Sequence, residues 1–144
     1  MQLVINDGGR SAAGYKGTAG DCVVRAIAIA TELPYQTVYD GINAMALSHE
    51  RRGKRKRGIS NARTGVYNRT IHRYMESLGW KWTPTMFIGS GCNFHLKADE
   101  LPTGRLVVML SKHTCAVIDG VIHDTSDPSR DETRCVYGYF RRTE

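Results

Sequence analysis

Residues 17–31 read Gly-Thr-Ala-Gly-Asp-Cys-Val-Val-Arg-Ala-Ile-Ala-Ile-Ala-Thr and predict a buried helix that begins at Cys22. Two glycines interrupt the preceding chain, and the carboxylate of Asp21 is suited to cap the helix that follows. From Val23 onward the segment is apolar nearly all round, which is typical of a helix in the middle of a molecule. Free backbone N–H groups in a first helical turn favour a thiolate, so Cys22 is a candidate nucleophile.

A second stretch, residues 111–125, predicts a β-hairpin. Residues that favour strands flank Asp119-Gly120, a pair preferred in two-residue type I′ turns. The turn sets the register. Ile118 pairs with Val121, and the pairing continues outward from the turn one residue at a time on each strand. In this register His113 lies opposite a position two residues after Asp124.

His113 and Asp124 therefore share one face of the hairpin as diagonal neighbours, with backbones about 7 Å apart. Asp124 can orient the His113 ring and stabilise its charged form, while the other ring nitrogen meets Cys22. His123 and Thr125 point to the opposite face and are poorer candidates. The shared face also carries apolar side chains, and we expect it to pack on the Cys22 helix: Cys115, Val117 and Ile122.

A cysteine that opens a helix, followed far downstream by His113 and Asp124 on adjacent strands, resembles the papain-like cysteine peptidase superfamily. Within it, the chain is most similar to small members such as bacteriocin-leader-processing peptidases and related phage cysteine hydrolases. The resemblance implies an α+β fold whose helical N-terminal half, with a central nucleophile helix, packs on a C-terminal antiparallel β-sheet. It also implies a Cys-His-Asp triad in which Cys22 attacks, His113 is the general base and later acid, and Asp124 orients the ring.

The oxyanion hole departs from the pattern of this family. Papain-like enzymes usually place a glutamine about six residues before the nucleophile, and that position here is Lys16. Lys16 and the backbone amide of Cys22 are the expected donors to the oxyanion, with Asn6 or Thr18 as further possibilities.

The chain fits a single domain over residues 1–144. Two further helices are expected, one over residues 35–47 and one that is capped by Thr64 and closed by Gly79. The second half is predicted to form an antiparallel meander. We expect strands at residues 2–6, 106–110, 113–118, 121–125 and 136–140, with a further strand at 80–83.

A basic segment accounts for the formal net charge of +6. It lies in a predicted mobile loop at about residues 48–63, which has little apolar content. A solvated loop is the simplest interpretation, and contact with nucleic acid or an acidic partner is the alternative. The basic residues of the loop are Arg51, Arg52, Lys54, Arg55, Lys56 and Arg57.

The cysteines show no disulfide-framework spacing, which favours a reducing compartment and free packing thiols at Cys92, Cys115 and Cys135. We therefore expect a cytoplasmic protein, in the host cytoplasm if phage-encoded, with no signal peptide and no membrane association. The potential zinc ligands Cys92 and His95, or His113 and Cys115, are not spaced as in a zinc finger. No metal ion or other cofactor is expected.

The predicted function is a cysteine hydrolase, namely a peptidase, isopeptidase or amidase that acts on a protein or peptide through a thioester acyl-enzyme. An acyltransferase or amine transferase would use the same order of residues. A different class remains open: a non-catalytic binding protein on a papain-like fold, which contacts nucleic acid or a host factor through its basic loop.

Overall fold

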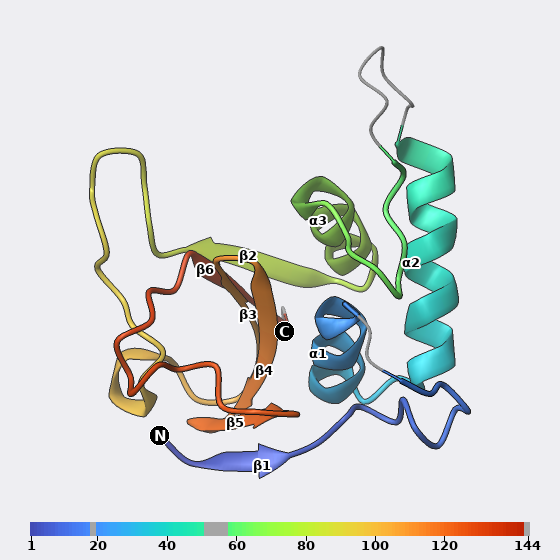
Figure 1. Cartoon of the computed structure of the whole chain (residues 1–144). Helices are drawn as coiled ribbons and strands as arrows, with labels where there is room; N and C mark the ends of the chain where they lie inside the picture. Colours follow the sequence, from blue (N-terminus) through green and yellow to red (C-terminus); the bar gives the residue numbers. More distant parts are fainter. Residues whose placement is uncertain (18–19, 51–57, 143–144) are drawn as a thin grey trace.

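The computed structural model describes residues 1–17, 20–50 and 58–142. Its α-helices lie on one face of a twisted sheet (Figure 1). The sheet is six-stranded and mixed, with the strand order β1-β5-β4-β3-β6-β2. The predicted α+β class is confirmed. In chain order the elements are β1 (Leu3–Ile5), α1 (Cys22–Thr31), α2 (Tyr35–His49), α3 (Asn68–Ser77), β2 (Trp80–Pro84), the 3-10 helix η1 (Ala98–Glu100), β3 (Arg105–Leu110), β4 (His113–Ile118), β5 (Val121–Asp124) and β6 (Gly138–Arg142).

Helix α1 lies between the sheet and α2, as its apolar sequence predicts. Every residue from Val23 to Ala30 is buried, including one charged residue, Arg25. The helix ends where Glu32 adopts a left-handed backbone conformation, with φ of 63°. This central position leaves its first turn, at Cys22, facing the ends of β4 and β5.

Helix α3 starts later than predicted. Thr64 was expected to cap it, but Thr64 belongs to a tight turn that the bridge between Asn61 and Gly65 closes. The helix begins at Asn68, after Tyr67. At its C-terminal end, Gly79 has φ of 82°, in agreement with the predicted stop.

The β4–β5 hairpin has the predicted register. Ile118 pairs with Val121, and Val117 pairs with Ile122. Asp119 and Gly120 both have positive φ, 48° and 78°, as a type I′ turn requires.

The prediction of which sheet face packs on α1 is wrong. Val117 and Ile122, with Cys115, belong to an apolar cluster on the far face of the sheet, where loops cover them. The side of the sheet toward α1 presents Ala116 and Ile118 instead. Alternation along a strand shows which residues share a face, but it does not show which face a helix covers. The far-face cluster also includes Leu96, Leu101, Leu106, Val108, Leu110 and Val136.

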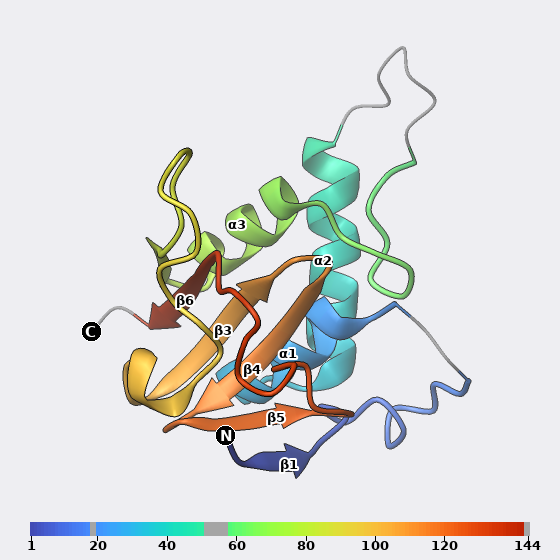
Figure 2. The same ribbon diagram turned by 60° about the vertical axis from the view of Figure 1, so that its left-hand side comes forward.

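The predicted antiparallel meander is correct for β3, β4 and β5 but wrong for the last strand. β6 does not pair with β5; it crosses to the other edge and lies between β3 and β2 (Figure 2). The free edge of β5 is taken by β1, which runs parallel to it. The sheet is consequently mixed, and β1 belongs to the same layer as the C-terminal strands.

The predicted basic loop lies partly outside the described residues. Arg51, Arg52, Lys54, Arg55, Lys56 and Arg57 all fall in that undescribed stretch. The described part at residues 58–63 is packed, in contrast to the mobile loop that was expected. Ala62 is fully buried and its backbone N–H donates to Asn43, while Ser60 donates its N–H to Glu50. In the described part of the chain, no helix has the length and apolar character needed to cross a membrane.

Gly138 lies where β6 packs tightly against β2. A Cβ atom there would lie 2.4 Å from the Trp82 side chain and 2.7 Å from a backbone oxygen of Thr83. We expect Gly138→Ala to lower the free energy of unfolding by about 1–3 kcal/mol, because the ring and the backbone must both move. Gly58→Ala, where a Cβ meets open space, is the matched control and should be nearly neutral. Chemical denaturation of both variants measures the difference, and equal stabilities would contradict the packing described here.

Candidate active site

Cys22 and His113 line one cleft of about 360 Å³. Cys22 enters it from the first turn of α1, and His113 enters from the start of β4. The turn before α3, the first residues of α3, the end of β3 and the turn after it form the other walls, so the cleft has both polar and apolar lining. Further lining residues are Thr64, Asn68, Ile71, Met109, Lys112 and Tyr137.

His113 is held by Asp124, as the hairpin register predicts. Nε2 of the His113 ring lies 2.6 Å from Oδ2 of Asp124. The other carboxylate oxygen, Oδ1, accepts the backbone N–H of Thr125 at 2.7 Å. Asp124 is buried, whereas His113 is partly open to the cleft. This arrangement leaves Nδ1 of His113 as the ring nitrogen for Cys22.

The electrostatics of the pair favour a thiolate and an imidazolium. Burial opposes the charge on Cys22, but a hydrogen bond with His113, the charge of His113, and the Thr114 backbone outweigh it, so the pKa of Cys22 is lowered. Burial also opposes the charge on His113. Its hydrogen bonds with Asp124 and Cys22 outweigh that effect and raise the pKa of His113 to about 9. The two shifts have the directions that nucleophilic thiol chemistry needs near neutral pH.

Asp124 carries its charge despite burial. Burial alone would raise the pKa of Asp124, but the hydrogen bonds from His113 and Thr125 and the nearby charge of Arg25 lower it. A charged Asp124 keeps the His113 ring both oriented and protonated.

Arg25 connects Asp124 to the residue before the candidate nucleophile. Its guanidinium is bonded to the carboxylate of Asp21 through Nη1, and its Nη2 lies 3.6 Å from Oδ1 of Asp124. Asp21 also accepts a hydrogen bond from the Tyr35 hydroxyl at 2.6 Å. The Asp21 side chain therefore does not cap α1 as predicted, because it is used in this buried network. Sequence reasoning missed Arg25, although a single charge in an apolar run, four residues after Asp21, was a visible signal.

The residues predicted to donate hydrogen bonds to the oxyanion do not all lie at the cleft. The backbone amide of Cys22 lies at the start of α1, beside the thiol. Lys16 is exposed, its carbonyl accepts a hydrogen bond from Arg63, and it is not part of the cleft lining. The Asn6 side chain bonds to Gly8 and His123 instead. Thr18 lies outside the described residues, and Asn68 is a cleft-lining amide that sequence reasoning did not consider.

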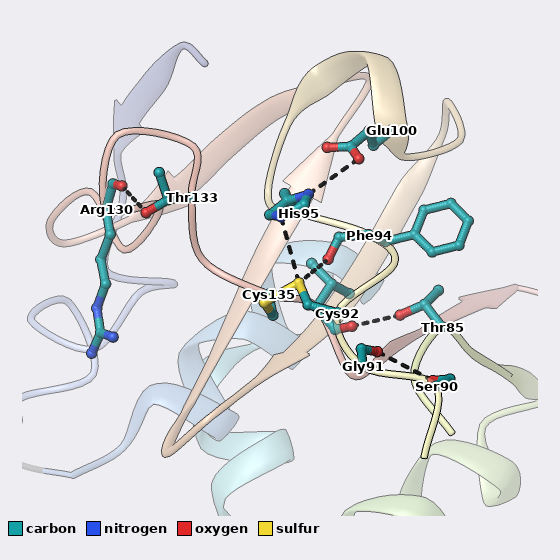
Figure 3. Close-up of a disulfide and its surroundings, with 11 residues drawn as sticks. Thr85, Ser90, Gly91, Cys92, Phe94, His95, Glu100, Arg130, Thr133 and Cys135 are labelled. Atoms are coloured by element: carbon teal, nitrogen blue, oxygen red, sulfur yellow. Dashed lines mark hydrogen bonds and ion pairs between the residues drawn. A yellow bond between two sulfur atoms is a disulfide. The ribbon is translucent and has the colours of Figure 1, made fainter. Parts of the chain in front are cut away.

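The other cysteines divide into two kinds. Cys115 is a buried free thiol, as predicted, and burial raises its pKa. The expectation that Cys92 and Cys135 are free is wrong, because a disulfide joins them (Figure 3). An isolated β-bridge between His95 and Cys135 brings the two segments together, and the disulfide joins cysteines that are 43 residues apart in sequence. The spacing of the cysteines in the sequence could not show this pairing. Because two of the four cysteines form a disulfide, the cysteine spacing no longer supports a reducing compartment.

Comparison with protein-family models, curated proteins and solved structures gives no match. The function of the cleft is therefore inferred from the chemistry of its own residues.

Proposed function

We propose that the protein is a papain-like cysteine hydrolase that cleaves an amide bond in a protein or peptide substrate. The contact between Asp124 and His113 is the observation that carries the proposal, because it places a charged carboxylate behind the imidazole that meets Cys22. A histidine that only filled space in the strand would not need this buried partner. The cleft in front of the thiol supplies room for an extended substrate with mixed polarity.

The reaction follows from the charges of the pair. The Cys22 thiolate attacks the carbonyl carbon, and the developing oxyanion faces the backbone N–H groups at the start of α1. His113 then gives its proton to the leaving amine, which departs and leaves a thioester on Cys22. His113 next removes a proton from water, which attacks the thioester, releases the acid and restores the thiol pair.

Lys16 remains a predicted donor to the oxyanion. Its exposed position means that its side chain must reach into the cleft when substrate binds. The Cys22 amide needs no such movement, so we assign it the principal role.

Active-site labelling with mass mapping tests the proposal. A set of peptidyl acyloxymethyl ketones with varied side chains should modify Cys22, with a mass gain on the peptide that contains it. His113→Ala should slow the labelling, and Cys22→Ser should abolish it. Preferential modification of buried Cys115, or labelling that ignores His113→Ala, would exclude this site as a thiol hydrolase.

The same acyl-enzyme could pass its acyl group to an amine. Added hydroxylamine distinguishes the two fates, because hydrolysis gives a carboxylic acid while transfer gives a hydroxamate. Predominant hydroxamate at low hydroxylamine concentration would identify a transferase. The cytoplasmic location expected from the sequence belongs to the same proposal. With Cys92 and Cys135 joined in a disulfide, its remaining support is that a catalytic thiol such as Cys22 persists in a reducing compartment.

The non-catalytic alternative rests on the basic segment of residues 51–57. If the protein grips nucleic acid, Cys22→Ala should leave binding unchanged, and neutralising the six cations should flatten the slope of log affinity against log salt. Strong binding that survives Cys22→Ala, together with an unreactive thiol, would replace the hydrolase proposal.

A further inference from the structure

The disulfide between Cys92 and Cys135 has a third potential ligand beside it. The two sulfur atoms and a ring nitrogen of His95 all lie within 4.8 Å of one another. Figure 3 shows His95 between the sulfur atoms and Glu100. Of these three residues, the sequence placed only Cys92 and His95 together, because Cys135 comes from a distant segment.

The His95 ring is oriented for metal binding. Nδ1 lies 3.3 Å from Oε1 of Glu100, and Nε2 lies 3.5 Å from Sγ of Cys92. With Nδ1 protonated and donating to the carboxylate, the lone pair of Nε2 points at the sulfur atoms. A disulfide sulfur has no proton to donate, so this lone pair accepts no hydrogen bond from Cys92 while Cys92 is oxidised. Histidines that bind zinc commonly have such a carboxylate behind the ring.

The spacing of the donor atoms suits a tetrahedral ion. With Zn–S bonds of about 2.3 Å and Zn–N bonds of about 2.0–2.1 Å, a sulfur and a nitrogen ligand lie about 3.5 Å apart. Sγ of Cys92 and Nε2 of His95 already have this separation, 3.5 Å. The two sulfur atoms must move apart, to about 3.8 Å, and breaking the disulfide permits this.

Backbone hydrogen bonds join the two segments that carry the ligands. Leu96 donates its N–H to the carbonyl of Arg134, and Val136 donates to the carbonyl of Phe94, both at 2.9 Å. Leu96 and Val136 are fully buried in the far-face cluster. His95 directly precedes Leu96 and Cys135 directly precedes Val136, so the backbone holds these two residues close together whether or not the disulfide is present.

We propose that the reduced protein binds one zinc ion through Cys92, His95 and Cys135, with Glu100 as a positioning residue and a solvent molecule as fourth ligand. A dithiol reductant supplies two electrons and two protons to the Cys92–Cys135 bond and becomes a disulfide itself. Two thiols result, and Zn²⁺ displaces their two protons. The site thus exchanges one cross-link for another between the same two segments, and it does so independently of the proposed hydrolase activity.

Cobalt titration of reduced protein tests this site. The Cys22→Ser chain is used so that the candidate nucleophile cannot act as a ligand. One Co²⁺ per chain should bind, with thiolate-to-cobalt charge-transfer absorption and the visible bands of a tetrahedral ion, and one equivalent of Zn²⁺ should displace it. The oxidised chain should bind none. No stoichiometric charge-transfer absorption after reduction would overturn the proposal.

Two substitutions locate the ion. Glu100→Ala should weaken metal binding by about 10–100-fold, the range expected for loss of a carboxylate behind a ligand histidine. Asp99→Ala, in the same short helix but exposed, is the matched control and should change nothing. His95→Ala should weaken binding at least as much as Glu100→Ala. If His95→Ala impairs folding, the comparison of Glu100→Ala with Asp99→Ala locates the ion by itself. Metal affinity that does not change in Glu100→Ala would place the metal elsewhere.

Discussion

Cys22 is expected to react with iodoacetamide at pH 6.5 about 10²-fold faster in the native chain than in a His113→Ala variant. An ordinary cysteine, with a pKa of about 8.5, is roughly 1% thiolate at this pH. Burial without an imidazolium partner would reduce that share further. In the native site the contacts with His113 lower the pKa of Cys22, so a larger share of this thiol is ionised than in the variant. Rate constants of alkylation, followed by mass spectrometry, measure the ratio.

The ratio of the two alkylation rates should depend on pH. The pKa of His113 is raised to about 9, so the imidazolium is present below that pH and is lost above it. The ratio between native chain and variant should therefore be largest in mild acid and should shrink toward 1 above pH 9, where the variant thiol also ionises. Asp124→Asn should give an intermediate rate, because the ring keeps a partner but loses the neighbouring charge. Equal rates for native and His113→Ala chains at pH 6.5 would show that the thiol is not activated by this pair.

Arg25→Met is expected to lower the free energy of unfolding by about 3–5 kcal/mol. Methionine keeps the apolar contacts of the side chain within α1 but removes its charge. Asp21, which is 1% exposed, then loses the partner bonded directly to it, and Asp124 loses a neighbouring cation. Arg10 and Tyr35 still contact Asp21, but a buried carboxylate that has lost its directly bonded cation is costly, and this cost exceeds the loss of any exposed ion pair. Urea denaturation measures the change.

Two further chains separate this charge effect from a helix effect. Arg69→Met, on the exposed side of α3, should change stability by no more than about 0.5 kcal/mol. Asp21→Asn added to Arg25→Met should recover part of the loss, since it removes one of the stranded charges. If the double variant is less stable than Arg25→Met alone, Asp21 is stabilised by Arg10 and Tyr35 without help from Arg25.

The features that the sequence predicts well are local ones. The helix at Cys22 follows from an apolar run after glycines, and the hairpin register follows from the two turn residues Asp119 and Gly120. The contact of His113 with Asp124 is a consequence of that register, so the pair could be predicted from one short segment. The chemical reactivity of Cys22 itself remains a prediction.

The features that the sequence does not predict depend on contacts between distant segments. The place of β6 beside β3 depends on a crossing over the sheet end, which no local pattern encodes. The Cys92–Cys135 disulfide depends on the same returning segment. The role of Arg25 was not predicted for another reason. A charged residue in a helix is normally expected at the surface, and Arg25 can be buried because the carboxylates of Asp21 and Asp124 lie beside it.

The position of β6 also bears on how the chain folds during synthesis. β6 is the sixth strand in sequence, yet it lies between β3 and β2 and is the strand that pairs with β2. A nascent chain that has not yet exposed residues 138–142 can form the β3–β4–β5 hairpins, but β2 has no neighbouring strand to join. Contacts between segments so far apart in sequence slow folding, because the connecting chain must be ordered first. We therefore expect the sheet to be completed late, only after β6 has been translated, with the pairing edge of β2 unpaired until then.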